Sequence, residues 1–342
     1  TAEGMNINAS LDSMMIHKMY INGYNFSNII AIGDITDNVA DLRLVSKNEA
    51  TPALFQGVVK LGKNLSFDNA KAYLNIPQLD LVATKIDKTN PNSLLGVSAD
   101  INIKKWENGM MLGNVHITDI DYINDRGEHR IDAIKLDSYA KNGENIITLN
   151  SPMIVAEYVS NDTPDKLVRR IKNSLFNKNL PILLREDEIY TDSLEILSHG
   201  NYRFSMQTFD MAPICRIVMP DLYIADSTKV DFSLNERDSI NLSLESKFIR
   251  WGKNLFSDVS LNLNNNDYKP HIDLTAEEIS VFGIEVMNNK ISMTADNGEI
   301  DLKYKFINDN ALTNSLDLNT LVRFDKNPDN SLLTTIEIKD SE

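Results

Sequence analysis

The side chains that could carry acid, base or metal chemistry are scattered along this chain of 342 residues. It contains five histidines, at His17, His116, His129, His199 and His271. None of them lies at metal-site spacing from another. His116 with Asp119 and Asp121 comes closest to a ligand cluster, and we interpret it as a solvent-facing strand end. The sequence therefore predicts no metal centre and no cofactor.

Catalytic motifs are equally absent from the sequence. It contains no nucleophile elbow, phosphate-binding glycine loop, dinucleotide fingerprint or zinc-protease motif. The acidic residues around Gly127 do not have calcium-loop spacing, and the acidic run 186–188 carries no glycosidase signal. Cys215 is the only cysteine, so the chain offers neither a disulfide nor a cysteine zinc site. We predict that the protein is not an enzyme; a β-rich hydrolase is the weakest of the alternatives.

Alternating apolar and polar residues predict strands through most of the chain. Val97, Ala99, Ile101 and Ile103 show this period of two, which places one apolar face opposite one polar face. The segment 79–86 is also expected to be a strand. The same pattern recurs more regularly after residue 239. The fold class is therefore predicted as all-β.

One short amphipathic helix is expected in the middle of the chain, over 161–184. Asn161, Asp162 or Thr163 could cap it, and Pro164 suits a first helical position. Its apolar stripe is formed by Leu167, Val168, Ile171 and Leu175. Its basic half, 166–172, is either an ordinary solvated face or a spot that attracts phosphate. The helix needs an apolar surface to lie on, and its neighbours in the chain are strands.

A weak internal repeat links three segments. Each has a glycine, a hydrophobic residue three positions on, an Asn or Asp, and then a new alternating strand. The copies begin at Gly252, Gly283 and, more loosely, Gly23, and the first two have corners at Asp258 and Asn289. Such repeats indicate an extended sheet.

Composition excludes several classes of protein. The net charge of −15 and a pI near 4.8 argue against nucleic-acid binding and against electrostatic adsorption to anionic lipid. No 18-residue apolar run is present, so no helical membrane span is expected. The chain begins without Met or a signal segment, which suggests a piece of a longer or processed protein.

The second half, over about 145–338, resembles the TamB branch of the AsmA-like superfamily, most closely its Bacteroidota-type members. The resemblance lies in the order of its elements. These are the Pro-containing helix start 163–168, the Leu-Pro segment 180–184, the strand 202–206, the segment 212–222, and the repeats at Gly252 and Gly283. The matching motifs are degenerate hydrophobic patterns.

The resemblance implies a periplasmic protein of the Gram-negative envelope, anchored in the inner membrane by a segment outside this chain. Family members are long sheets curled into a U-shaped apolar trough. They meet an Omp85-type outer-membrane barrel and carry phospholipid towards the outer membrane, with a related role in outer-membrane protein assembly. This chain would be a middle section of such a protein.

We therefore expect an elongated, curled, antiparallel-rich sheet, divided into segments 1–160, 161–184 and 185–342, whose apolar face holds phospholipid acyl chains. The helical stripe would cover part of this groove. The expected lining residues are Ile240, Leu242, Leu244, Phe248, Leu261, Leu263, Ile291, Met293, Ile300, Leu302, Tyr304 and Phe306. Alternation alone leaves a second fold open, because tandem closed β-sandwiches of a structural or adhesive module that binds protein or glycan would show the same pattern.

Overall fold

The computed structural model describes most of the chain. The described residues are 8–21, 23–62, 66–88, 90–107, 110–177, 179–184, 200–219, 221–265, 268–308, 314–327 and 331–341. They form two compact units. Unit 1 comprises 1–141 and 146–152, and unit 2 comprises 142–145 and 153–342.

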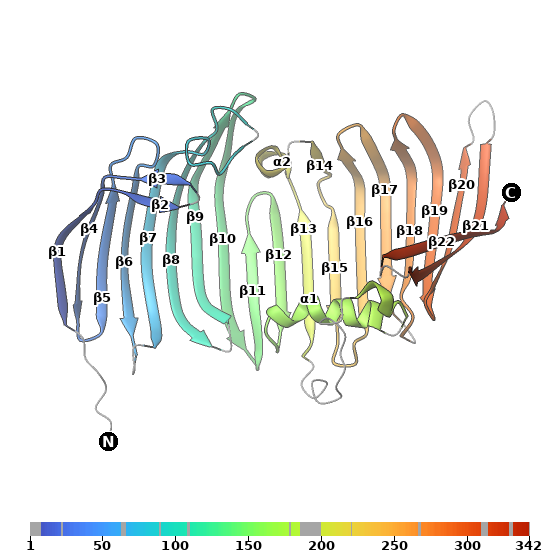
Figure 1. The fold of residues 1–342 in the computed structure, drawn as a ribbon, viewed down its shortest axis with the longest axis horizontal. Helices are drawn as coiled ribbons and strands as arrows, with labels where there is room; N and C mark the ends of the chain where they lie inside the picture. Colours follow the sequence, from blue (N-terminus) through green and yellow to red (C-terminus); the bar gives the residue numbers. More distant parts are fainter. Residues whose placement is uncertain are drawn as a thin grey trace, which may run out of the picture. The chain divides into compact units, whose positions relative to one another are not determined.

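Unit 1 is built from consecutive antiparallel strands (Figure 1). Its strands are β1 (Ala9–Ile16), β2 (Met19–Ile21), β3 (Tyr24–Phe26), β4 (Ile29–Thr36), β5 (Val39–Ser46), β6 (Ala53–Leu61), β7 (Phe67–Asp80), β8 (Leu94–Glu107), β9 (Met110–Asn124), β10 (Gly127–Lys141) and β11 (Glu144–Asn150). β1 pairs with β4, and each strand from β4 to β9 pairs with the next one in the chain. β2 and β3 form a separate hairpin.

Unit 2 continues with the same architecture and adds the helices. Its strands are β12 (Ile154–Ser160), β13 (Tyr202–Thr208), β14 (Leu222–Ile224), β15 (Lys229–Leu234), β16 (Ile240–Trp251), β17 (Asn254–Asn264), β18 (His271–Val281), β19 (Ile284–Asp296), β20 (Glu299–Asn308), β21 (Asn314–Lys326) and β22 (Leu332–Ser341). Its helical segments are α1 (Asp165–Lys172), the π-helical turn η2 (Asn173–Asn177), the 3₁₀ turn η3 (Pro181–Leu183) and α2 (Ala212–Val218). β13 pairs with both β12 and β15, and β16 with both β15 and β14.

The described strands, apart from the β2–β3 hairpin, belong to one antiparallel sheet of 20 strands that does not close into a barrel. This confirms the predicted all-β class and the antiparallel-rich sheet. The alternative of tandem β-sandwiches is wrong for the described residues, because a sandwich needs two large sheets packed face to face.

Several strands or strand entries contain a residue with positive φ, which bends the chain locally. Asn28, Asp258 and Asn288 have φ of 57°, 43° and 52°. Asn and Asp tolerate this conformation better than other non-glycine residues, because their short polar side chains can bond locally. All three belong to the repeat copies, so the repeat encodes a recurring bend. In the copy that begins at Gly283, the bend falls on Asn288 rather than on the predicted corner at Asn289.

The segment 79–86 was expected to be a strand, and this is wrong. β7 ends at Asp80, and turns follow it. The Asp80 carboxylate accepts a hydrogen bond from the Ala83 N–H at 2.8 Å, and its carbonyl accepts one from the Thr84 hydroxyl at 2.7 Å. These local side-chain bonds satisfy the backbone without a sheet partner and so favour the turn.

The helix is confirmed but is shorter than the expected span of 161–184. Regular α-helix ends at Lys172, and the chain continues through η2 and η3. Pro164 occupies the N-cap position, and no side chain caps the helix there. Asp162 instead accepts bonds from the Thr163 N–H and the Lys166 ammonium, both at 2.8 Å. The predicted side-chain cap is therefore wrong.

Candidate functional site: the apolar inner face

Strand register in unit 2 gathers apolar side chains on one face of the sheet, which we call the inner face. Residues directly opposite one another on neighbouring strands lie on the same face. One row that crosses the sheet is Tyr158, Phe204, Phe232, Leu242, Leu263, Ile272, Met293 and Leu302. The next row is Ala156, Met206, Val230, Leu244, Leu261, Leu274, Ile291, Tyr304 and Leu318. Both rows run across at least eight strands.

The register places all twelve predicted lining residues on this face. Eight of them stand in the two rows. Ile240 is paired with Leu234, at the end of the strand that carries Leu242. Ile300 lies two positions from Leu302, on the same side of β20. Phe306 lies two positions from Tyr304 on β20, and Phe248 lies four positions from Leu244 on β16, so even spacing places both on the same side.

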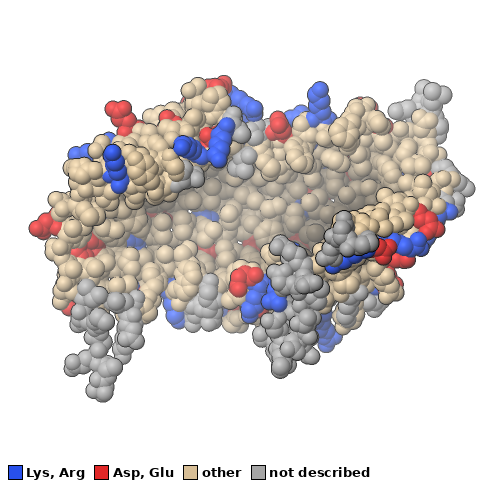
Figure 2. All heavy atoms as spheres, viewed as in Figure 1, with Lys and Arg blue, Asp and Glu red and all other residues tan. Residues whose placement is uncertain are grey.

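These inner-face side chains are not covered as a closed core would be. Leu242, Leu263, Met293 and Leu302 are all only half-buried. Figure 2 shows this face of unit 2 as a hollow with a largely uncharged floor and with charged side chains concentrated at its margins. An apolar surface of this extent, left accessible to water, is typical of a binding surface.

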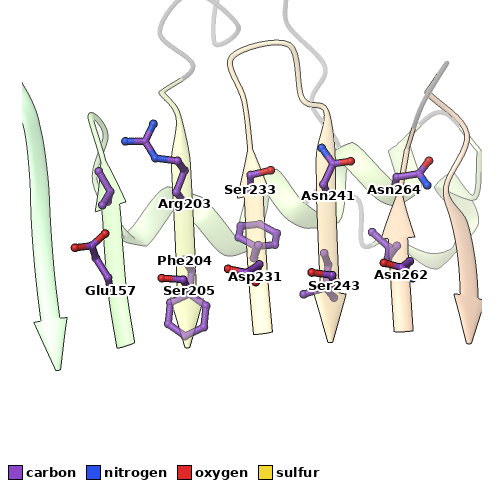
Figure 3. A pocket seen from close by; sticks show the side chains of 14 residues that line it. Glu157, Arg203, Phe204, Ser205, Asp231, Ser233, Asn241, Ser243, Asn262 and Asn264 are labelled. Atoms are coloured by element: carbon purple, nitrogen blue, oxygen red, sulfur yellow. The ribbon is translucent and has the colours of Figure 1, made fainter. Parts of the chain in front are cut away.

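The opposite, outer face of unit 2 is polar and charged. Ion pairs join neighbouring strands there, including Lys305–Asp317 at 3.0 Å and Arg323–Glu299 at 2.6 Å. A shallow hollow of about 410 Å³ crosses this face from β12 to β17. Figure 3 shows it with α1 behind the strands; its polar lining includes Glu157, Arg203, Ser205, Asp231, Ser233, Asn241, Ser243, Asn262 and Asn264. Polar and apolar side chains are thus separated by strand parity.

Unit 1 has an apolar row of the same kind, which the prediction of lining residues missed. The row is Ala31, Leu44, Phe55, Leu74, Ala99, Ile117 and Ile134. The alternation from Val97 to Ile103 was the sequence signal that could have identified it. Only the register shows that seven separate strands contribute to one row.

The α1 helix lies on the inner face of unit 2. Leu167, Ile171 and Leu175 pack against a buried cluster formed by Tyr202, Leu234 and Ile240, each 1% exposed. The prediction that these three helix residues cover apolar sheet surface agrees with this packing. Val168 does not belong with them, because its side chain is 63% exposed. It follows Leu167 by one residue, a rotation of about 100° that turns it away from the sheet.

The basic half of the helix is not uniformly solvated, because Arg170 is buried with 2% of its side chain exposed. Its guanidinium donates to the Asp238 carboxylate at 2.8 Å and to the carbonyls of Asn235 and Gly200. Its Cζ also lies 5.3 Å from the centre of the Tyr202 ring. Arg170 is thus an anchor for the helix, and the expectation of a wholly solvated or phosphate-attracting basic face is wrong for this residue.

Hydrogen bonds extend this anchorage along the helical segment. Asn265 donates to the Ser174 hydroxyl at 2.8 Å and to the Asp238 carbonyl at 2.7 Å. Further along, the Asn179 amide donates to the Tyr268 carbonyl, and the Gly298 N–H donates to the Asn179 carbonyl at 2.6 Å. The segment is therefore fixed to the turns that follow β15, β17 and β19.

The environment of Tyr202 perturbs its ionisation. Burial raises the pKa of its phenol well above the ordinary value, and the Asp162 carboxylate adds to the effect. The neutral hydroxyl donates to the Thr163 carbonyl at 3.2 Å. Tyr202 therefore stays neutral beneath the helix and forms part of the buried surface on which the helix packs.

The histidines do not form a site in the described residues. His271 bonds Thr294 at 2.9 Å and Asp273 at 2.8 Å on the outer face. Asp121, from the acidic cluster near His116, is instead paired with Arg130 at 2.6 Å. No group of three potential metal ligands occurs in the described part of the chain. His199 and the run 186–188 lie outside it.

Within the described ranges, no helix is long and apolar enough to cross a membrane. Comparison with protein-family models, with curated proteins and with solved structures finds no match to this chain.

Proposed function

We propose that this protein binds the acyl chains of phospholipid on its inner face and conducts them along it. The observation that supports this is the pair of apolar rows in unit 2, which cross the sheet without a break and remain half-buried. A surface of this kind loses unfavourable contact with water when an alkyl chain covers it.

The energetics favour such a surface. Each CH₂ group removed from water contributes about 0.8 kcal/mol. Adjacent strands are about 4.8 Å apart, so eight side chains in a row span on the order of 30 Å. A chain moving along the rows would exchange one apolar contact for another at each step, so no single step exposes the whole chain to water.

The setting of this activity follows only from the resemblance to TamB-like proteins. On that basis we propose a periplasmic conduit that carries phospholipid between the inner and outer membranes and supports outer-membrane biogenesis. An Omp85-type barrel would be its outer-membrane partner, and a segment outside this chain would anchor it.

The decisive experiment measures lipid that remains bound to the protein after detergent-free purification. Leu242→Asp places a carboxylate in the middle of one apolar row, and Asn241→Asp places the same group one residue away on the outer face. Mass spectrometry of organic extracts should find phospholipid in the parent and in Asn241→Asp. We expect at least a tenfold loss in Leu242→Asp, because an unpaired charge on an apolar surface is strongly unfavourable.

Circular dichroism and the urea midpoint of each variant establish that both proteins are folded. Equal lipid in the folded Leu242→Asp variant and its control would refute the proposal, as would a parent that neither retains lipid nor takes it up from vesicles.

A further inference from the structure

Unit 2 exposes large apolar side chains where three of its turns meet. Met219 follows α2, Trp251 ends β16, Phe282 lies in the turn between β18 and β19, and Ile284 begins β19. They are 49%, 65%, 92% and 68% exposed. We call these residues, with the turns that carry them, the tip edge. It lies at the ends of the strands, beside α2 and β14 (Figure 1).

Hydrogen bonds hold the three turns together. The Gly252 N–H donates to the Asp221 carbonyl at 2.8 Å, which joins the β16–β17 turn to the turn after α2. The Phe282 N–H donates to the Asn254 side chain at 3.3 Å, which joins the two neighbouring hairpins. The apolar tips therefore form one line of neighbouring turns.

The turn geometry projects these side chains outward. Gly252 and Gly283 have φ of 61° and 80°, and Phe282 itself has φ of 53°. A positive φ is unfavourable for a bulky residue, and the Phe282 ring gains little burial in return. The two-residue hairpin turn needs a positive φ at both Phe282 and Gly283, so the β18–β19 pairing offsets the backbone cost, whereas the ring stays uncovered in the free protein.

Basic side chains accompany the tips. Arg216, Arg250 and Lys253 are exposed, and none of them forms an ion pair with another described residue. The Arg250 guanidinium instead lies 5.6 Å from the centre of the Tyr223 ring, which also stacks on Phe248. The turn residues 216–221, 250–254 and 281–285 contain these three cations and two carboxylates, Asp221 and Glu285. Their formal charge is therefore +1 (three minus two), whereas the whole chain carries −15.

We propose that the tip edge docks onto the surface of an anionic phospholipid bilayer. Tryptophan and other aromatic side chains favour the membrane–water interface, and nearby Lys and Arg are attracted to anionic headgroups. Four apolar side chains carried by three neighbouring turns suit a fluid interface, because lipid can pack around each of them. This inference concerns a different surface from the inner face and does not depend on acyl-chain binding there.

The chain contains only two tryptophans, Trp106 and Trp251, so each can serve as a reporter for one unit. Trp106, at the end of β8 in unit 1, is 57% exposed and therefore makes a matched control. In Trp106→Phe, vesicles that contain phosphatidylglycerol should shift Trp251 emission to the blue, and lipids with spin-labelled chains should quench it. In Trp251→Phe, the emission of Trp106 should not change.

Vesicle sedimentation then measures the contribution of each group. Phe282→Ser should weaken binding to phosphatidylglycerol-containing vesicles by about tenfold, because it removes most of an exposed apolar side chain. Lys253→Gln should weaken binding by about fivefold and leave the weak affinity for pure phosphatidylcholine unchanged. Lipid retention on the inner face should be the same in both variants, which separates this test from that of the conduit.

Unchanged Trp251 emission with both kinds of vesicle would overturn the proposal. A blue shift that depends on protein concentration and needs no vesicles would also overturn it, in favour of a second copy of the chain on the tip edge. Equal binding by the parent and by a folded Phe282→Ser variant would show that any membrane contact lies elsewhere.

Discussion

At the scale of single residues, Arg170 is the most consequential side chain of unit 2. Its charge is buried and is balanced by one carboxylate, two carbonyls and an aromatic face. Neighbouring residues of the same charge do not share this position. Arg169 and Lys166 are both exposed. The role of a basic residue in this helix is therefore set by where it points rather than by its type.

We expect Arg170→Ala to lower the free energy of unfolding of unit 2 by about 3–5 kcal/mol, because it removes a buried guanidinium that donates to Asp238 and to two carbonyls. Urea denaturation provides the measurement. Arg169→Ala, one residue earlier, should cost no more than about 0.5 kcal/mol. Similar losses in the two variants would contradict the anchoring role.

Tyr202 makes the stability of unit 2 sensitive to alkaline pH. Its pKa is raised in the folded protein, because burial and the Asp162 carboxylate disfavour the phenolate. An unfolded tyrosine ionises near pH 10, so the stabilisation that unit 2 gains from un-ionised Tyr202 is fully present below that pH. As the pH rises from about 10 towards the pKa of Tyr202 in the folded protein, the free energy of unfolding then falls by up to about 1.4 kcal/mol per pH unit.

The measurement compares urea midpoints at about pH 8 and about pH 11. The parent should lose more stability across this range than Tyr202→Phe, which has no phenol to ionise at this position. The same alkaline loss in both proteins would assign the effect to other groups.

At the scale of elements, the helical segment formed by α1 and η2 is amphipathic, and three of its residues fix its orientation on the sheet. Leu167, Ile171 and Leu175 contact the sheet, whereas Val168 faces solvent. The four residues were equivalent members of one stripe in the sequence. Leu167 and Val168 are consecutive, so they point about 100° apart around the helix. Only Leu167 faces the sheet, and Val168 is left exposed to solvent.

This asymmetry predicts different outcomes for the same substitution. Ile171→Asp should destabilise unit 2 by several kcal/mol, because it places a charge between the helix and the Tyr202 cluster. Val168→Asp should change stability by less than about 1 kcal/mol. Thermal denaturation of the two variants tests the orientation, and equal destabilisation would show that Val168 is also covered.

Elements also explain why one strand prediction was wrong. The residues 79–86 have strand-like composition, but Asp80 bonds Ala83 and Thr84 and turns the chain. Such local bonds depend on backbone geometry that hydrophobic alternation does not report. The helix cap was wrong for the same reason, because Asp162 bonds Thr163 and Lys166 rather than capping α1.

At the scale of the whole molecule, both units follow one building rule. Each is an antiparallel meander in which strand parity sends apolar residues to one face and polar residues to the other. The outer face of unit 2 carries cross-strand ion pairs, and its inner face carries the apolar rows. The acidic net charge therefore does not oppose the binding of acyl chains, because the charges and the apolar rows occupy different faces.

The sequence by itself determined the all-β class, the position of the helix and the face on which each predicted lining residue lies. Alternation has a period of exactly two residues in a regular strand, so Leu242, Leu261 and Leu302 could be assigned to one side before any pairing was known. Local bends were also encoded, because Asn and Asp in the repeat accept a positive φ.

Only the tertiary structure decided whether that face is open or closed, and which strands extend it. The same alternation serves a closed sandwich and an open sheet, because the pattern reports one buried side but not what covers it. Strand pairing also joined the row that runs from Ala31 to Ile134 in unit 1, and packing of α1 on the sheet buried the Arg170 side chain between them. These outcomes depend on contacts between residues far apart in the chain, for which the local pattern contains no signal.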